Sequence, residues 1–344
     1  MPVDYEQSKP ILGHAYFAYA LSVTNTRSCG VKLSQDERFT SYRHASLALQ
    51  SLRDIHVTSA QQAATCLILG TMIMLFAMFE RPCNVYTLSR QTLILLQPVY
   101  DTLTRPGPNQ FFFLTGIIML EMIGSLIYGT VPALHFREPE DSPYIDRYLG
   151  LSTSLLPVLS QVCELNWAVS PAGQGERDIH WITDTMDKLE AATLTWKIDF
   201  PKGLCQSFSA IEIAHIFCQA QVMRMAALLM IYRMRFPFGT HDLPARTIGI
   251  SILTRLESTM LATGKPVKFV MVPVLVGCIE LIGEERDRWM PHVPKLACCS
   301  NGYGSYIQAV VRACWAVRDS GVHFKGYGVG QYFHDEWIWI MKLK

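Results

Sequence analysis

The sequence predicts an all-α protein, a single compact array of about twelve helices over residues 1–344. Three observations lead to this fold class. Apolar residues recur at helical spacing along most of the chain, clean strand alternation is nearly absent, and clusters of turn-forming residues separate the periodic segments. No linker is long or polar enough to separate independent domains.

Three amphipathic segments show the helical period most clearly. They cover Ser41–Val57, Asp178–Ile198 and Tyr306–Val317, and charged side chains face away from the apolar stripe in the first two. Each segment therefore predicts a helix that buries one face.

Three further segments are apolar around their whole circumference. Ala63–Phe79 is an uncharged run of 17 residues, whereas Phe111–Tyr128 and Val267–Ile282 contain the single carboxylates Glu121 and Glu280. A carboxylate in the middle of a span is costly in lipid, and Ala63–Phe79 lacks cationic and aromatic flanking anchors. We expect core helices and no membrane span.

Turn chemistry places the breaks between these elements. Pro and Gly cluster with small polar residues at 104–109, 137–143, 170–175 and 236–240. Pro98 and Pro157 lie inside apolar stretches, where each should kink or end a helix.

Charge and cysteine spacing argue against direct contact with DNA. The formal net charge is only +1, so the basic footprint of a phosphate-binding surface is missing. The ten cysteines contain no Cys-x-x-Cys pair, which argues against a structural zinc site or any other bound metal. The polar, acidic start is no secretory signal, so we expect reduced thiols in an intracellular protein.

Five segments, read in order, are similar to one known family. They are Tyr42–Leu52, Ala63–Gly70, Tyr144–Pro157, the run of Pro273, Gly277 and Glu280 followed by Arg286, and the Trp-containing end Asp335–Met341. Together they resemble the regulatory (effector) region of fungal zinc binuclear-cluster transcription factors. The resemblance implies a helical regulatory fold over nearly the whole chain.

The chain departs from that family at its N-terminus. A six-cysteine cluster and a basic linker should precede the regulatory region, and neither is present in this sequence. The chain is then either a fragment or misannotated gene product, or a regulatory fold released from DNA. Met1 followed soon by a helix-like segment favours a complete protein.

One apolar segment, 208–232, carries the main candidate site. Glu212, His215 and Gln219 stand at i, i+3 and i+7, on one helical face. A solvent-facing stripe and a polar strip lining a cavity both explain this spacing. On the second interpretation Glu212 and His215 are catalytic and Gln219 binds the ligand; no second Glu-x-x-His supports a metal site.

Other candidates lie elsewhere in the sequence. Glu121 is either half of a buried ion pair or a functional acid, and Glu280 with Arg286 has the same two interpretations. Trp167 and Tyr148 are expected ligand-binding residues, because an aromatic cavity with few polar groups suits an apolar metabolite.

Two functions remain open at this point. The first is a stand-alone small-molecule protein of fungal secondary metabolism, such as a cytoplasmic, cofactor-free cyclase, pericyclase or isomerase. The second is an effector-binding regulatory module, nuclear in that case, which acts on transcription through a partner. The expected partner is an apolar metabolite without cofactor or nucleic acid, and a homodimer is one alternative for the assembly.

Overall fold

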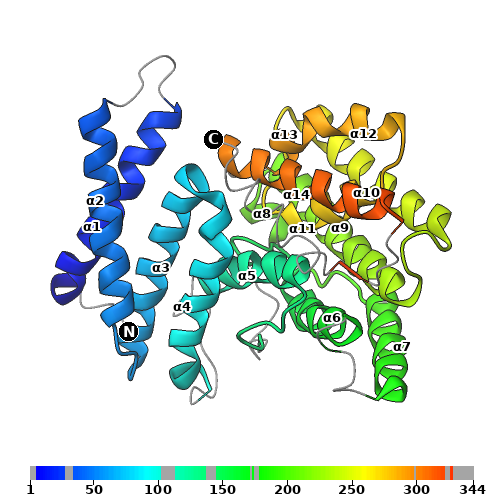
Figure 1. The fold of residues 1–344 in the computed structure, drawn as a ribbon, viewed down its shortest axis with the longest axis horizontal. Helices are drawn as coiled ribbons and strands as arrows, with labels where there is room; N and C mark the ends of the chain where they lie inside the picture. Colours follow the sequence, from blue (N-terminus) through cyan, green and yellow to red (C-terminus); the bar gives the residue numbers. More distant parts are fainter. Residues whose placement is uncertain are drawn as a thin grey trace. The chain divides into compact units, whose positions relative to one another are not determined.

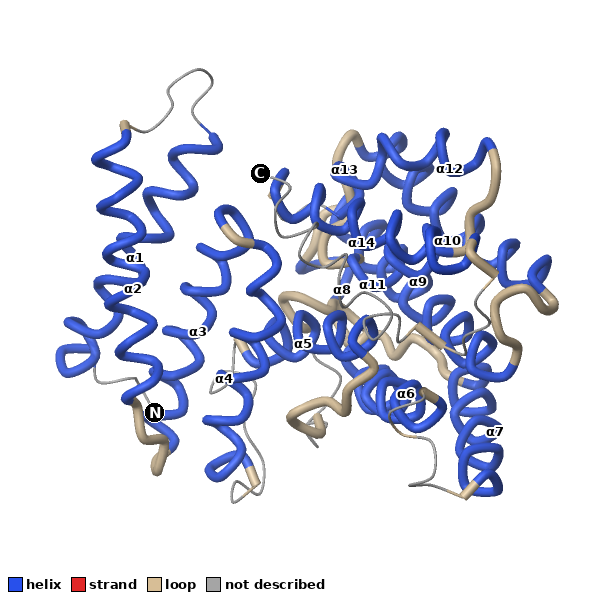
Figure 2. Tube along the Cα trace, in the orientation of Figure 1, coloured by secondary structure: helices blue, strands red, loops and turns tan. Residues whose placement is uncertain are grey.

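The computed structural model describes residues 5–27, 34–101, 113–136, 145–170, 173, 178–297, 300–321 and 326–327. Within those ranges the chain forms fourteen α-helices, three short 3-10 helices and no strand, apart from one isolated bridge (Figure 2). The predicted all-α class is confirmed.

Contacts divide the chain into two compact units, residues 1–121 and 122–344. In the first unit, α1 packs against α2 and α3, and α3 packs against α4 (Figure 1). Its elements are α1 (Tyr5–Arg27), α2 (Gln35–Asp54), α3 (Ala60–Glu80), η1 (Pro82–Asn84) and α4 (Val85–Tyr100), and α5 (Leu114–Tyr128) crosses the boundary. The single domain expected over 1–344 stays a prediction.

The second unit is built around one long helix, α9 (Ala210–Arg235), which packs against α6, α7, α10 and α11. The other elements of this unit are η2 (Thr153–Leu155), α6 (Leu156–Val169), α7 (Ile179–Thr195), α8 (Leu204–Ser207), α10 (Asp242–Thr263), α11 (Met271–Ile279), α12 (Glu284–Trp289), η3 (Met290–His292), α13 (Val293–Ala297) and α14 (Asn301–Asp319).

The amphipathic segments form helices, as predicted, with ends set by local capping. α2 begins earlier than the apolar period suggests, because Ser34 and Glu37 form a capping box ahead of it. α7 ends at Thr195, and the Trp196 indole then donates to Ser154 Oγ at 2.9 Å.

Within the part of the chain that the structure describes, two apolar helices, α3 and α9, are long enough to cross a membrane on length and composition alone. In the structure 72% of the most apolar window of α3 and 50% of that of α9 are buried. Core helices of this size give the same signal, so these two helices are weak evidence for a membrane protein.

The two prolines behave differently. α4 ends two residues after Pro98, as expected. Pro157 instead lies in the first turn of α6, so the expectation that it kinks or ends a helix is wrong. A first-turn proline loses no helical hydrogen bond, and its fixed φ suits a helix start. Of the four expected breaks, 236–240 joins α9 to α10, and the other three lie wholly or partly outside the described residues.

A buried ion pair links two segments of the second unit. Glu280 pairs with Arg233 of α9, whose Nη2 lies 2.6 Å from Oε2, and each residue is 1% exposed. The Tyr327 hydroxyl donates to Glu280 Oε1 at 3.2 Å. The expected pairing of Glu280 with Arg286 is therefore wrong: Arg286 binds Asp319 at 2.7 Å.

The described cysteines carry free thiols. Burial raises the pKa of the Cys66 and Cys278 thiols to about 12. Cys205 on α8 is exposed. The buried members are Cys66, Cys163, Cys218, Cys278 and Cys314.

Candidate functional site

A pocket of about 490 Å³ lies in the second unit, beside the first turns of α9. Its other walls are the turn 145–150 and the segment 267–269. Four of the six residues expected from the sequence line it: Tyr148, Glu212, His215 and Gln219. The cavity interpretation of the polar strip on α9 thus has a matching feature in the structure.

The turn 145–150, which lines the pocket, is held by its own hydrogen bonds. Asp146 Oδ1 accepts from the backbone N–H groups of Tyr148 and Leu149 at 2.8 and 2.9 Å. The backbones of Asp146 and Gly150 bond each other twice, both at 2.9 Å. Gly150 has a φ of +57°, a conformation that a residue with a Cβ adopts only with strain.

Gln219 links this turn to the segment 267–269, which also lines the pocket. Its Nε2 donates to the Tyr148 carbonyl at 2.7 Å and to the Lys268 carbonyl at 3.2 Å. One side chain on α9 therefore links two segments that are distant in sequence. Gln219 is 6% exposed, so these bonds are made in a largely desolvated place.

His215 stands one turn before Gln219 and is fixed through one ring nitrogen. Its Nε2 lies 2.8 Å from Thr263 Oγ1 at the end of α10. Burial lowers the pKa of His215, and the charges of Lys265 and Lys268 act in the same direction, against a hydrogen bond to the Lys265 backbone. The imidazole is therefore neutral at neutral pH.

Glu212 serves the start of α9. Ser209 N and Oγ both donate to Glu212 Oε2 at 2.8 Å, and Ser209 Oγ accepts from Glu212 N in return. These bonds from Ser209 lower the pKa of the exposed Glu212. The carboxylate lines the pocket but closes a capping box, which gives it a structural role beside the expected catalytic one.

Aromatic rings make up much of the remaining wall. Tyr148 meets Phe269 edge to face, with ring centroids 4.9 Å apart and an interplanar angle of 82°. Phe208 also lines the pocket. Burial raises the pKa of Tyr148 to about 12, so its hydroxyl stays protonated. Phe269 has a φ of +54°, which is unusual for a bulky residue and marks local backbone strain.

The other two expected residues lie elsewhere. Glu121 belongs to the first unit, where its Oε1 pairs with Arg90 Nη1 at 2.8 Å, the structural alternative considered for it. Trp167 is a half-buried residue of α6 and does not line the pocket. The structure thus brings four of the six together.

Sequence reasoning missed several residues of the site. The Ser-x-x-Glu spacing of Ser209 and Glu212 is a readable capping box ahead of an apolar helix. Thr263, Lys268 and Phe269 carried no such local signal, because they reach the pocket only through the packing of distant segments.

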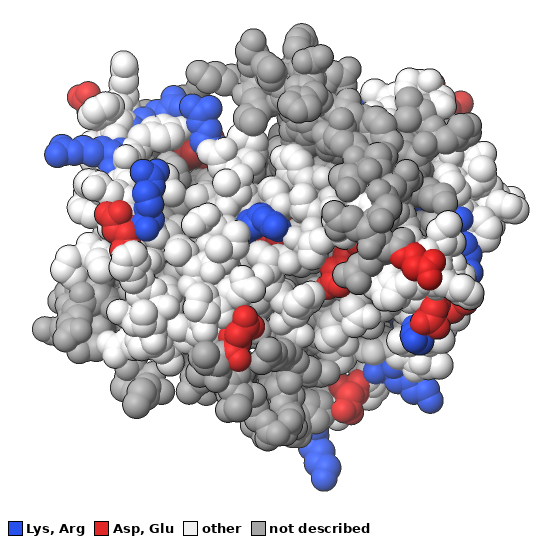
Figure 3. All heavy atoms as spheres, turned by 60° about the horizontal axis from the view of Figure 1, so that its bottom comes forward, with Lys and Arg blue, Asp and Glu red and all other residues white. Residues whose placement is uncertain are grey.

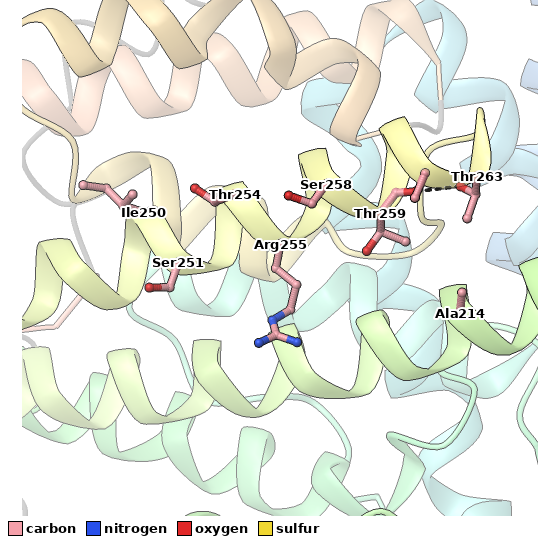
Figure 4. A pocket seen from close by; sticks show the side chains of 9 residues that line it. Ala214, Ile250, Ser251, Thr254, Arg255, Ser258, Thr259 and Thr263 are labelled. Atoms are coloured by element: carbon pink, nitrogen blue, oxygen red, sulfur yellow. Dashed lines mark hydrogen bonds between the residues drawn. The ribbon is translucent and has the colours of Figure 1, made fainter.

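A second hollow, of about 610 Å³, runs along α10. Figure 4 shows the hydroxyl side chains of Ser251, Thr254 and Ser258 along it, with Arg255 extended towards α9. Thr263 lines this hollow and also holds His215 of the first pocket. Five of its nine lining residues carry hydroxyls, so it is the more polar of the two.

Charged side chains of both signs line the first pocket, namely Asp146, Arg147, Glu212 and Lys268, and Arg255 lines the second hollow. On the face drawn in Figure 3, the described surface is mostly neutral, with acidic and basic side chains both scattered over it. Among the residues that the structure covers, no three His, Cys, Asp or Glu side chains come together to hold a metal ion.

Comparison with known proteins identifies the family. Neither a curated protein nor a solved structure gave a match. A model of the fungal specific transcription factor domain matches residues 15–344, which is nearly the whole chain. The order of segments noted in the sequence and the helical fold agree with this match. The chain belongs to the fungal specific transcription factor domain family.

Proposed function

We propose that this chain is a regulatory module of transcription that binds an apolar small molecule in the pocket beside α9. Family membership supports a role in transcription, and the pocket supports ligand binding. A nuclear location follows from this role. Contact with DNA then comes through a partner or a separate zinc-cluster segment.

One observation carries the proposal: Gln219 joins α9, the turn 145–150 and the segment 267–269 at the pocket. A ligand in the pocket touches all three segments at once. It can therefore favour one arrangement of them over another, which is what an effector must do to shift a population.

The same contacts rank binding above catalysis. Glu212 is engaged by Ser209, and His215 Nε2 is engaged by Thr263. A general acid or base needs a reactive atom within reach of the substrate. The cyclase interpretation remains a prediction with no geometric feature in its favour.

A reporter assay tests the proposal. The full chain is fused to a heterologous DNA-binding domain, and reporter transcription is measured in fungal cells with and without apolar metabolite extract. We expect the extract to change transcription, the change to disappear in Gln219→Leu, and Gln221→Leu, on the same helix but outside the pocket lining, to respond normally.

Two outcomes contradict the proposal. If the fusion and the DNA-binding domain alone give the same transcription in every condition, the regulatory role is rejected. If the purified chain converts a metabolite and has no effect on transcription, the pocket is better explained as the active site of an enzyme.

A further inference from the structure

We infer that the pocket takes a flat aromatic ligand with a hydroxyl group, and that this hydroxyl donates to Oε1 of Gln219. The inference rests on the proposed ligand-binding role and narrows it to a chemical class. It concerns what the pocket recognises and leaves open how recognition reaches the transcription machinery.

The side-chain amide of Gln219 has a defined orientation. Its two neighbours at hydrogen-bond distance are the carbonyl oxygens of Tyr148 and Lys268. Carbonyl oxygens only accept, so the group facing them must be the NH2. Both of its protons are used, and the position of Oε1 is fixed by the same two bonds.

Gln219 Oε1 lies in a close-packed place beside the turn. Oε1 lies against Gly150, where an added Cβ would stand only 2.7 Å from it. None of the residues that the structure describes donates a hydrogen bond to Oε1. Gln219 as a whole is 6% exposed and lines the pocket, so its acceptor oxygen is available to whatever occupies the pocket.

Aromatic side chains form part of the apolar wall of the pocket. Tyr148 and Phe269 stand edge to face, and Phe208 lines the same pocket. Aromatic rings favour offset or edge contacts with another ring, which a planar ligand can supply. Ile216 and Val267 complete an apolar lining for the ligand body.

The charges in the pocket lining favour a hydroxyl over a carboxylate on the ligand. An ionised carboxylate cannot donate to Oε1, and it would approach the carboxylates of Asp146 and Glu212, which line the same pocket. The side chains of Arg147 and Lys268, also in the lining, make an aromatic acid the alternative outcome.

A matched ligand series tests the inference on the full purified chain. β-Naphthol carries the hydroxyl, its methyl ether keeps the ring system without the donor, and β-naphthoate replaces the donor by a carboxylate. Dissociation constants come from ligand-observed NMR titration. We expect β-naphthol to bind at least tenfold more tightly than its ether, and more tightly than β-naphthoate.

Variants then locate the effect. Gln219→Leu should reduce the ratio between naphthol and ether to within about twofold, and Gly150→Ala should reduce it by displacing Oε1. Phe208→Ala should weaken both ligands alike and leave the ratio unchanged. Circular dichroism melting shows that each variant is folded.

Three results overturn the inference: equal affinity for naphthol and ether, tighter binding of naphthoate, or a ratio that survives in both Gln219→Leu and Gly150→Ala. Tighter binding of naphthoate keeps the pocket as a ligand site and changes only the class. Failure of the reporter assay with a normal naphthol ratio rejects the regulatory role and leaves this inference standing.

Discussion

The two ends of α9 handle buried polar groups in different ways. At the C-terminal end, Arg233 and Glu280 are each 1% exposed and pair through two nitrogens and two oxygens. At the N-terminal end, Gln219 uses both amide protons but leaves its oxygen without a donor among the described residues.

The difference separates a buried ion-pair cluster from the proposed binding site. The C-terminal cluster also includes the Tyr327 hydroxyl and the face of the Phe238 ring, 4.3 Å from the Arg233 guanidinium carbon. Burial is the largest single influence on the pKa of Arg233 and lowers it, but the hydrogen bond and charge of Glu280, with the charges of Tyr327 and Asp242, together raise that pKa. Incomplete pairing and the strained Phe269 backbone occur together at the other end, as is common where a protein meets a ligand.

Glu280→Leu should have the largest effect and break the C-terminal cluster. It leaves Arg233 buried beside an apolar group, and among the described residues the half-exposed Asp242 is the acid that still pairs with it. We expect the free energy of unfolding to fall by about 3–5 kcal/mol, measured by urea denaturation. The double variant Arg233→Met with Glu280→Leu should recover most of that loss. A single variant within 1 kcal/mol of wild type would show that the pair does not hold the unit together.

Gln219→Leu should have a smaller effect on stability. It removes the donors to the Tyr148 and Lys268 carbonyls, which lie beside a pocket that water can enter. We expect a loss of about 1–3 kcal/mol in the same urea assay. Gln221→Leu is the matched control, with a smaller change expected. If Gln219→Leu cost more than Glu280→Leu, the proposed division between the two ends would be reversed.

Ser209→Ala removes the cap that opens α9. Both partners of the capping box are exposed, so water replaces part of what is lost. The expected decrease in the free energy of unfolding is about 1 kcal/mol. An increase in the Glu212 pKa, measured by NMR titration, should accompany it, because Ser209 supplies the bonds that lower this pKa. An unchanged Glu212 pKa would contradict the capping geometry.

The pH dependence of His215 should be the smallest effect. The folded state disfavours the protonated ring, so the unfolded state binds more protons as the pH falls below the ordinary pKa of 6.5. Stability should therefore be full above that pH and decline below it. His215→Gln should flatten part of the decline, measured as urea midpoints across pH 5–8 (about the range of histidine titration). Parallel curves for variant and wild type would show that His215 does not contribute to the pH dependence of stability.

The fold was readable from the sequence because helices depend on nearby residues. The period in Ser41–Val57 and the apolar run from Ala63 each needed only a short window of sequence. The i, i+3, i+7 spacing of Glu212, His215 and Gln219 has the same local origin, so their shared face could be predicted.

The partners of those residues could not be predicted. Gln219 bonds residues 71 and 49 positions away, and Arg233 pairs with Glu280 across 47 positions. Helical spacing carries no information about such pairs. The nearby Arg286 was a reasonable but wrong choice for Glu280, because the packing of α11 on α9 decides the pairing. Trp167 shows the same limit: aromatic character does not say which cavity a ring lines.

The contrast between buried and exposed thiols makes it possible to attach a probe beside the pocket. A thiol reagent needs a thiolate, and burial keeps Cys66 and Cys278 protonated at neutral pH. Cys205 is exposed, three positions before the pocket residue Phe208. With Cys29, Cys83, Cys298 and Cys299 replaced by serine, a maleimide dye should label Cys205 selectively and report occupancy of the pocket by a change in fluorescence.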